Sequence, residues 1–195
     1  MKDNISSFYA LVFRQKNIKR WGLMRSIVPE TLAEHSSECA ILTHALATIG
    51  NEIYGKKYDV GKAVIMALFH DVPEVFTGDM PTPIKYANEA IRNEFSVIEK
   101  ESAGNLVSKL PKELQGIYQP LFSDGDEELQ KLVKSADRLC AYIKCTEEMK
   151  LNNSEFKSAK LVIENKLKNS DMSELCYFME HFLPAFDLTL DEQQS

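Results

Sequence analysis

Apolar residues recur three and four positions apart along most of the chain, which is the spacing of helices that bury one face. Residues 5–13 follow this spacing and predict a first helix. Thr31 and Glu34 form the pattern of a capping box, so a second helix is predicted to begin there and to run to about Tyr54. Asp59 is a plausible N-cap for the next helix, because its side chain can accept hydrogen bonds from the first backbone N–H groups.

The same spacing continues through the second half of the chain and predicts further helices there. They lie at residues 84–110, 114–121, 127–151, 154–168 and 173–186, and the polar end at residues 191–195 is expected to be frayed. A chain of 195 residues, 44% of them hydrophobic, can bury a full core. We therefore predict an all-α protein in which residues 1–195 form a single-domain helical bundle.

Composition narrows the set of partners and the compartment. The formal net charge is −6 and the pI is near 5.3, so the chain lacks the excess of basic residues typical of nucleic-acid binders. No window approaches the roughly 18 apolar residues of a membrane span, and no signal-like apolar core follows the first residues. We expect a soluble cytoplasmic protein with neither nucleic acid nor membrane as a partner. The four cysteines form no C-x-x-C pair and are interpreted as reduced core residues: Cys39, Cys140, Cys145 and Cys176.

The stretch at residues 67–83 is the strongest candidate for chemistry. An apolar run leads into His70 and Asp71, so these two groups end an element that otherwise has the pattern of buried core. Buried charge must be paired or must hold a metal. The helical pattern cannot continue unbroken after Pro73, and an ordered, non-helical loop is then expected from its glycine and prolines: Gly78, Pro81 and Pro83.

Two further polar residues fall on apolar helical faces, where solvation does not explain them. His35 shares a stripe with Leu32 and Cys39, although a core histidine bonded to a carbonyl is ordinarily the better interpretation of such a residue. Asp137 falls inside the apolar stripe of the helix at 127–151, where an unpaired carboxylate would be costly. Either an arginine or a cation must therefore lie beside Asp137.

Two imidazoles and two carboxylates from separate helices would make a four-ligand site for one divalent cation: His35, His70, Asp71 and Asp137. Such mixed ligands do not distinguish Co²⁺, Mn²⁺, Zn²⁺, Ni²⁺ and Fe²⁺. Near the N-terminus, Arg20 adjoins Trp21, the only tryptophan. A charge run is usually a solvated face, and that interpretation suffices for the neighbouring lysines. A guanidinium, however, offers a planar fork for phosphate oxygens, and an adjacent indole could fix its direction.

The order and spacing of these residues resembles the HD-domain phosphohydrolases, an all-α family named for the adjacent pair that appears here as His70-Asp71. Longer segments resemble the bacterial 5′-deoxynucleotidases within that family. They are Arg20-Trp21, Ala33-Glu34-His35-Ser36, His70-Asp71 followed by Glu74, Thr77-Gly78-Asp79-Met80-Pro81-Thr82-Pro83, and Ala136-Asp137. The resemblance covers nearly the whole chain. Arg20-Trp21 together with the loop at residues 77–83 is specific enough to indicate this subfamily.

The resemblance implies an HD-type bundle, a homodimer and a role for each motif residue. The implied metal ligands are His35, His70, Asp71 and Asp137, and the implied catalytic residues are Glu74 and Asp79. The implied substrate contacts are Arg20, Trp21, His35, Asp79, Met80, Pro81 and Thr82. Pro73, directly before Glu74, is not matched to the family pattern and could shift the Glu74 carboxylate.

The chemistry of a phosphomonoesterase fits these residues without the family. A phosphate dianion needs its oxygens neutralised, a water placed in line and a proton for the leaving alkoxide. We therefore expect a metal-dependent 5′-nucleotidase acting on 2′-deoxyribonucleoside 5′-monophosphates. Hydrolysis of a nucleoside triphosphate or an alarmone is the first alternative, but it would require a broader basic pocket. A non-catalytic nucleotide-sensing module is the second, and the presence of Glu74 and Asp79 argues against it.

Overall fold

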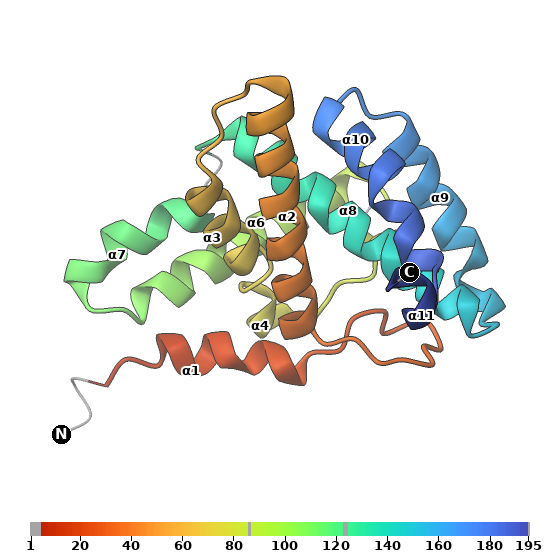
Figure 1. Ribbon diagram of the computed structural model, residues 1–195. Coiled ribbons are helices and arrows are strands. Elements are labelled where there is room, and N and C mark those ends of the chain that lie inside the picture. The colour runs from red at the N-terminus through yellow and green to blue at the C-terminus, as the bar shows by residue number, and fades with distance from the viewer. Residues whose placement is uncertain (1–4, 86, 123–124, 195) are drawn as a thin grey trace. The chain divides into compact units, whose positions relative to one another are not determined.

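The computed structural model describes residues 5–85, 87–122 and 125–194, and helices make up nearly all of its regular structure (Figure 1). Across those ranges, extended backbone pairs only in an isolated antiparallel bridge between Lys19 and Thr31. The all-α prediction is confirmed. In chain order the elements are α1 (Phe8–Val12), η1 (Phe13–Asn17), α2 (Leu32–Tyr54), α3 (Val60–Phe69), α4 (Glu74–Thr77), α5 (Thr82–Lys85), α6 (Glu89–Ser108), α7 (Lys112–Tyr118), η2 (Gln119–Phe122), α8 (Glu127–Lys150), η3 (Ser154–Phe156), α9 (Lys157–Lys168), α10 (Ser173–His181), η4 (Leu183–Asp187) and α11 (Leu190–Gln193).

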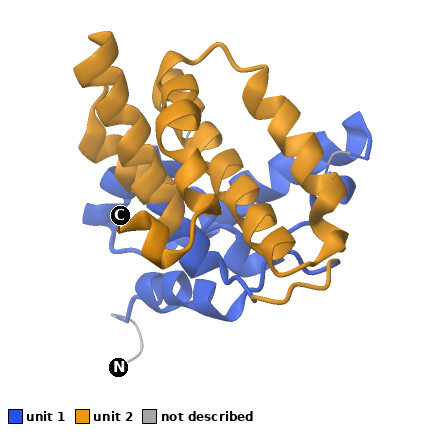
Figure 2. Cartoon of the chain, turned by 45° about the vertical axis from the view of Figure 1, so that its right-hand side comes forward, with its two compact units in different colours: residues 1–23, 29–37, 68–125 blue, residues 24–28, 38–67, 126–195 orange. Residues whose placement is uncertain are grey.

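The chain divides into two compact units that alternate along the sequence (Figure 2). Unit 1 holds residues 1–23, 29–37 and 68–125, and unit 2 holds residues 24–28, 38–67 and 126–195. Both α2 and α3 contribute residues to each unit, because the division falls within these two helices. That residues 1–195 form one domain stays a prediction.

Unit 1 is built on α6, which packs against α1, α4, α5 and α7. Its buried core holds Phe8, Val72 and Leu106, with Phe69 packed against them. Phe8 stacks on Phe69 with ring centroids 6.5 Å apart. Burying side chains of this size stabilises the fold by roughly 1.5 to 3 kcal/mol each. Since Phe69 and Val72 flank His70-Asp71 in the sequence, this core anchors the backbone that carries these two of the predicted metal ligands.

The core of unit 2 is a single apolar cluster that includes one face of α8 and residues of α2, α3 and α10. The stripe expected on α8 is buried, and its members are Leu129, Leu132, Val133, Ala136, Cys140 and Ile143. Asp137 follows Ala136 on this helix and is half-buried. Three of the four cysteines are buried free thiols, whereas Cys176 is exposed, so the prediction of a core position is wrong for Cys176.

Several helix starts follow the local signals of the sequence. Thr31 Oγ1 accepts a hydrogen bond from the Glu34 N–H over 3.3 Å, and the Glu34 carboxylate accepts one from the Thr31 N–H over 2.7 Å. This is the predicted capping box of α2. Asp59 accepts a hydrogen bond from the Lys62 N–H over 2.9 Å and so caps α3 as predicted.

Three expectations about helix bounds need correction. The helix expected at residues 84–110 is interrupted, because α5 ends at Lys85 and the Asn88 side chain caps a new helix, α6. Within that range Tyr86 lies outside the described residues. Thr82 already begins α5, so the non-helical loop is shorter than expected. Near the C-terminus, Thr189 and Glu192 form a second capping box that starts α11 in a segment expected to be frayed, of which Ser195 lies outside the described residues. Among the described helices, none combines the length and the apolar character that a membrane crossing requires.

Candidate active site

The turn after α3 keeps a helical course through Pro73. The Val72 N–H donates to the Phe69 carbonyl over 3.2 Å, and the Glu74 N–H donates to the Asp71 carbonyl over 3.0 Å. Pro73 has φ −55° and ψ −24°, and it directly precedes α4. A proline fits the start of a helix because its missing N–H would have no partner within the helix there. Pro73 therefore does not swing Glu74 away, and the Glu74 side chain is buried.

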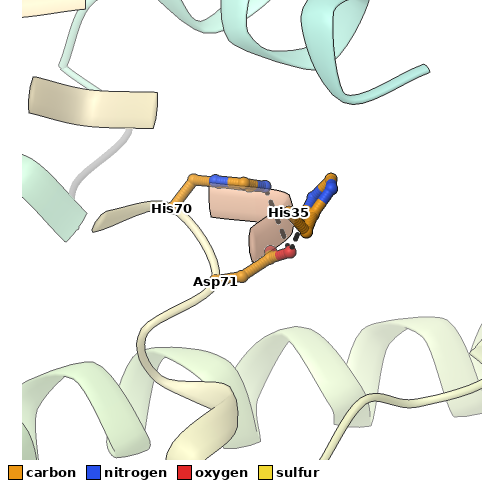
Figure 3. Close-up of side chains that lie close together, drawn as sticks. All are labelled: His35, His70 and Asp71. Carbon is orange, nitrogen blue, oxygen red and sulfur yellow. Dashed lines mark ion pairs between the residues drawn. The ribbon is translucent and has the colours of Figure 1, made fainter. Parts of the chain in front are cut away.

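Three of the predicted metal ligands lie together in unit 1. His35, His70 and Asp71 each offer one ligand atom, and these atoms all lie within 4.8 Å of one another. Asp71 Oδ2 lies 3.1 Å from His70 Nε2 and 3.5 Å from His35 Nε2, so both imidazoles face the same carboxylate (Figure 3). His35 comes from the first turn of α2 and is fully buried. Two imidazole nitrogens and a carboxylate oxygen are donors suited to a divalent ion such as zinc, so the cluster fits one.

The electrostatics of the cluster keep Asp71 ionised. Burial alone would raise its pKa, but the nearby charge of His70 and hydrogen bonds with His35 and His70 hold the pKa of Asp71 well below its usual range. An ionised carboxylate is the form that binds a cation. Asp71 is therefore already in its ligand form in neutral solution.

The surroundings of Glu74 raise its pKa, whereas those of Asp71 lower the pKa of that residue. Burial, followed by the repulsion of the Asp71 and Asp79 carboxylates, raises the pKa of Glu74 to about 9. Its Oε2 accepts no hydrogen bond from any described residue. A carboxyl group with so high a pKa holds its proton in neutral solution and can donate it, as a general acid must. Lys85 and Arg20 oppose this shift, and Lys85 is a site residue that the sequence did not reveal.

Arg20 lies beside Trp21, with the Arg20 guanidinium carbon 5.9 Å from the centre of the Trp21 ring. The Trp21 backbone N–H donates to Asp79 Oδ2 over 3.2 Å. Burial raises the pKa of Asp79, and Arg20 and this N–H partly offset that rise. Trp21 has φ 61°, the left-handed region that non-glycine residues rarely adopt. This strained residue thus links the N-terminal segment to the loop after α4.

Glu30 is a second residue of this site that the sequence did not reveal. One of its oxygens accepts from Arg20 Nη1 over 3.1 Å, and the other accepts from Trp21 Nε1 over 2.6 Å. Its Oε1 also lies 3.8 Å from His35 Nδ1. Glu30 precedes the capping box, outside any periodic pattern, and the only local signal was an acid close in sequence to His35.

Four predicted site residues remain, and their roles stay predictions: Met80, Pro81, Thr82 and Asp137. Met80 and Pro81, in the loop after α4, are half-buried, and Thr82, the first residue of α5, is exposed, so their contacts with substrate stay predictions. Asp137 belongs to α8 in unit 2, and its role as the fourth metal ligand likewise stays a prediction.

The helical fold is that of the HD-domain phosphohydrolases. The crystal structure of an HD-domain phosphohydrolase from Listeria innocua shares it with a TM-score of 0.83 at 22% identity, over 97% of this chain and 92% of the other. An HD phosphohydrolase from cyanophage S-2L, bound to dA and one catalytic Zn²⁺ ion, shares it with a TM-score of 0.64 at 20% identity, over 92% of this chain and 96% of the other. At these identities the likeness establishes the fold alone.

Sequence comparison identifies the family. The family described as 5′-deoxynucleotidase YfbR-like matches residues 7–186. A 5′-deoxynucleotidase of Klebsiella pneumoniae is 44% identical over 189 residues, which cover 96% of this chain and 95% of that protein. The 5′-deoxynucleotidase YfbR of Escherichia coli is 45% identical over 190 residues, with the same coverage. The chain belongs to the YfbR-like 5′-deoxynucleotidase family, and the predicted enzyme class, a phosphoric monoester hydrolase, is confirmed.

Proposed function

We propose that this chain removes the 5′-phosphate from 2′-deoxyribonucleoside 5′-monophosphates, with one divalent cation at His35, His70 and Asp71. The observation that carries the proposal is that this ligand cluster lies in the same unit as a buried Glu74 whose pKa is raised by burial and by the neighbouring carboxylates. Membership of a deoxynucleotidase family supports the choice of substrate. From the sequence resemblance we also propose that Asp137 supplies the fourth ligand.

The ligand set accepts several ions. Imidazole and carboxylate donors suit Zn²⁺, Co²⁺, Mn²⁺, Ni²⁺ and Fe²⁺, and the zinc ion of the cyanophage phosphohydrolase supports a cation of this kind. When bound, a divalent cation supplies positive charge to the phosphoryl group and activates water for attack. The ionised Asp71 contributes the negative charge that such a cation needs.

The side chains around the cluster supply the rest of the reaction. Arg20 offers its guanidinium to the phosphate oxygens, and its position over the Trp21 ring directs that fork. Glu74, which holds a proton in neutral solution, donates it to the leaving 5′-oxygen. Asp79 Oδ2 is bonded to the Trp21 N–H, and its Oδ1 accepts a hydrogen bond from the 3′-hydroxyl of the sugar.

The cellular compartment and the oligomeric state are also part of the proposed function. We propose that the protein works in the cytoplasm as a homodimer, an expectation that rests on the sequence resemblance. Size-exclusion chromatography with light scattering tests the assembly, and a monomer at micromolar concentration contradicts it.

The test of activity is phosphate release from a panel of nucleotides. Deoxyribonucleoside monophosphates, ribonucleoside monophosphates and deoxyribonucleoside triphosphates are each supplied with Zn²⁺, Co²⁺, Mn²⁺, Ni²⁺ or Fe²⁺, and with a chelator as control. His70→Ala should lose activity, whereas His44→Ala, which changes an exposed histidine on α2, should keep it. Turnover of triphosphates alone supports the first alternative, and no turnover of any nucleotide supports a sensing module.

A further inference from the structure

Glu30 contacts three residues that have different roles in the proposed function: Arg20, Trp21 and His35. It is 8% exposed, and its two oxygens accept hydrogen bonds from Arg20 and from the Trp21 indole. The same carboxylate lies 3.8 Å from His35 Nδ1, on the side of the ring away from the Nε2 that faces Asp71. One buried carboxylate, that of Glu30, therefore lies beside the proposed phosphate-binding Arg20, the Trp21 ring and the proposed metal ligand His35.

We propose that Glu30 is a positioning residue that fixes the phosphate-binding pair Arg20-Trp21 and the metal ligand His35 in one geometry. This inference rests on the proposed function, because it assigns Arg20 to substrate and His35 to the cation. Glu30 itself touches neither, and it acts through the groups that do.

The contact with His35 orients the ring. A carboxylate beside Nδ1 favours the tautomer that carries its proton there, which leaves the Nε2 lone pair for a cation. At 3.8 Å the attraction is electrostatic rather than a direct hydrogen bond. Carboxylates that accept a hydrogen bond from a ligating histidine raise its basicity, and their loss commonly weakens metal binding 10- to 100-fold.

The contacts with Arg20 and Trp21 need a carboxylate for a reason of geometry. Backbone bonds bring the segments together, since the Arg20 N–H donates to the Glu30 carbonyl over 2.9 Å. Each side-chain oxygen then accepts from a different donor, Arg20 Nη1 or Trp21 Nε1. A glutamine has only one oxygen, and its NH₂ group accepts nothing. Glu30→Gln must therefore lose one of these two contacts and the negative charge that faces His35.

The experiment compares Glu30→Gln with Glu155→Gln in the full chain. Glu155 also pairs with an arginine, Arg25, over 2.9 Å, but it lies outside the proposed site and provides a matched control. Trp21 is the only tryptophan, so its fluorescence in the metal-free protein reports the Glu30 contact directly. Zinc titration then reports the effect on His35, and steady-state kinetics with dAMP separates KM from kcat.

In Glu30→Gln we expect three changes relative to the wild type: the Trp21 emission shifts, the affinity for zinc falls by roughly tenfold or more, and the KM for dAMP rises. Glu155→Gln should match the wild type in all three measurements. Wild-type emission and zinc affinity in Glu30→Gln would overturn the proposal. If that variant fails to fold, Glu30→Asp keeps both oxygens and the charge on a shorter stem, and it should show smaller changes in the same direction. Unchanged emission and zinc affinity in Glu30→Asp would also overturn it. Emission is measured without metal or nucleotide, so a wild-type enzyme that releases no phosphate refutes the proposed function separately.

Discussion

The backbone N–H of Trp21 donates a hydrogen bond to Asp79 Oδ2 over 3.2 Å, across 58 positions of sequence. This bond joins a strained residue of the N-terminal segment to the loop between α4 and α5. It also occupies one oxygen of the carboxylate proposed to bind the sugar. Asp79 is thereby held in one orientation, which is what a residue that discriminates between sugars requires.

The first prediction concerns the choice of sugar. The prolines Pro81 and Pro83 limit how far the Asp79 loop can yield, because their rings fix φ. If Asp79 binds the 3′-hydroxyl and apolar atoms meet C2′, a 2′-hydroxyl is buried without a partner. That costs roughly 1 to 3 kcal/mol, so kcat/KM should favour dAMP over AMP by about ten- to hundredfold. Kinetics with the matched pair checks this, and equal values contradict it.

The second prediction concerns the proton donor. Glu74→Ala should bind metal and substrate like the wild type but lower kcat by roughly 10²- to 10⁴-fold, the usual contribution of a general acid or base. Single-turnover kinetics and nucleotide titration separate the two effects. Glu101→Ala, which changes an exposed acid on α6 in the same unit, is the control and should keep the wild-type kcat. A wild-type kcat in Glu74→Ala would show that Glu74 is only a buried acid.

The sequence predicted the elements whose signals are local. The capping box of Thr31 and Glu34 and the N-cap at Asp59 act within one turn, so they marked α2 and α3 without tertiary information. The clustering of His35 with His70 and Asp71 was also predictable, because polar groups on apolar faces must find partners or a cation inside the fold.

The rest depended on contacts that no periodic pattern encodes. Glu30 reaches Trp21 because the segments around Lys19 and Thr31 pair in an isolated bridge, and such a pairing leaves no mark on hydrophobic spacing. The break before α6 was missed for a related reason. Apolar residues keep helical spacing on both sides of Asn88, so only its side-chain bond to the Ile91 N–H reveals the new start.

The third prediction tests the proposed fourth ligand. Asp137→Ala should lose stoichiometric metal and most activity while keeping a helical fold, because it removes one of four proposed ligands. Metal analysis of the purified variant and circular dichroism measure the two outcomes. Glu128→Ala, an exposed acid on the same helix α8, should keep its metal. Metal bound to Asp137→Ala at wild-type affinity would show that this aspartate is no ligand.

The last prediction concerns Glu148, a fully buried carboxylate on α8 in unit 2. Its oxygens accept hydrogen bonds from the backbone N–H groups of Ile27 and Val28, over 2.9 and 3.0 Å, and from the side chains of Lys144 and Asn153. Burial alone would raise the pKa of Glu148. The Lys144 ammonium and the other donors outweigh it and lower the pKa from 4.5 to about 2.

A carboxylate whose folded pKa lies below its unfolded pKa stabilises the fold above the unfolded value, and that stability is lost as the pH falls through the folded value. Glu148→Gln should therefore unfold with about 3 kcal/mol less free energy than the wild type at pH 7. The difference should narrow to roughly half at pH 3, because there the Glu148 carboxylate of the unfolded wild-type chain takes up a proton while that of the folded chain stays ionised. Urea unfolding at pH 7, 4.5 and 3 measures this. Glu128→Gln on the exposed part of α8 should show no such trend. A Glu148→Gln difference that stays constant from pH 7 to pH 3 would mean that the Glu148 charge contributes nothing to holding residues 24–28.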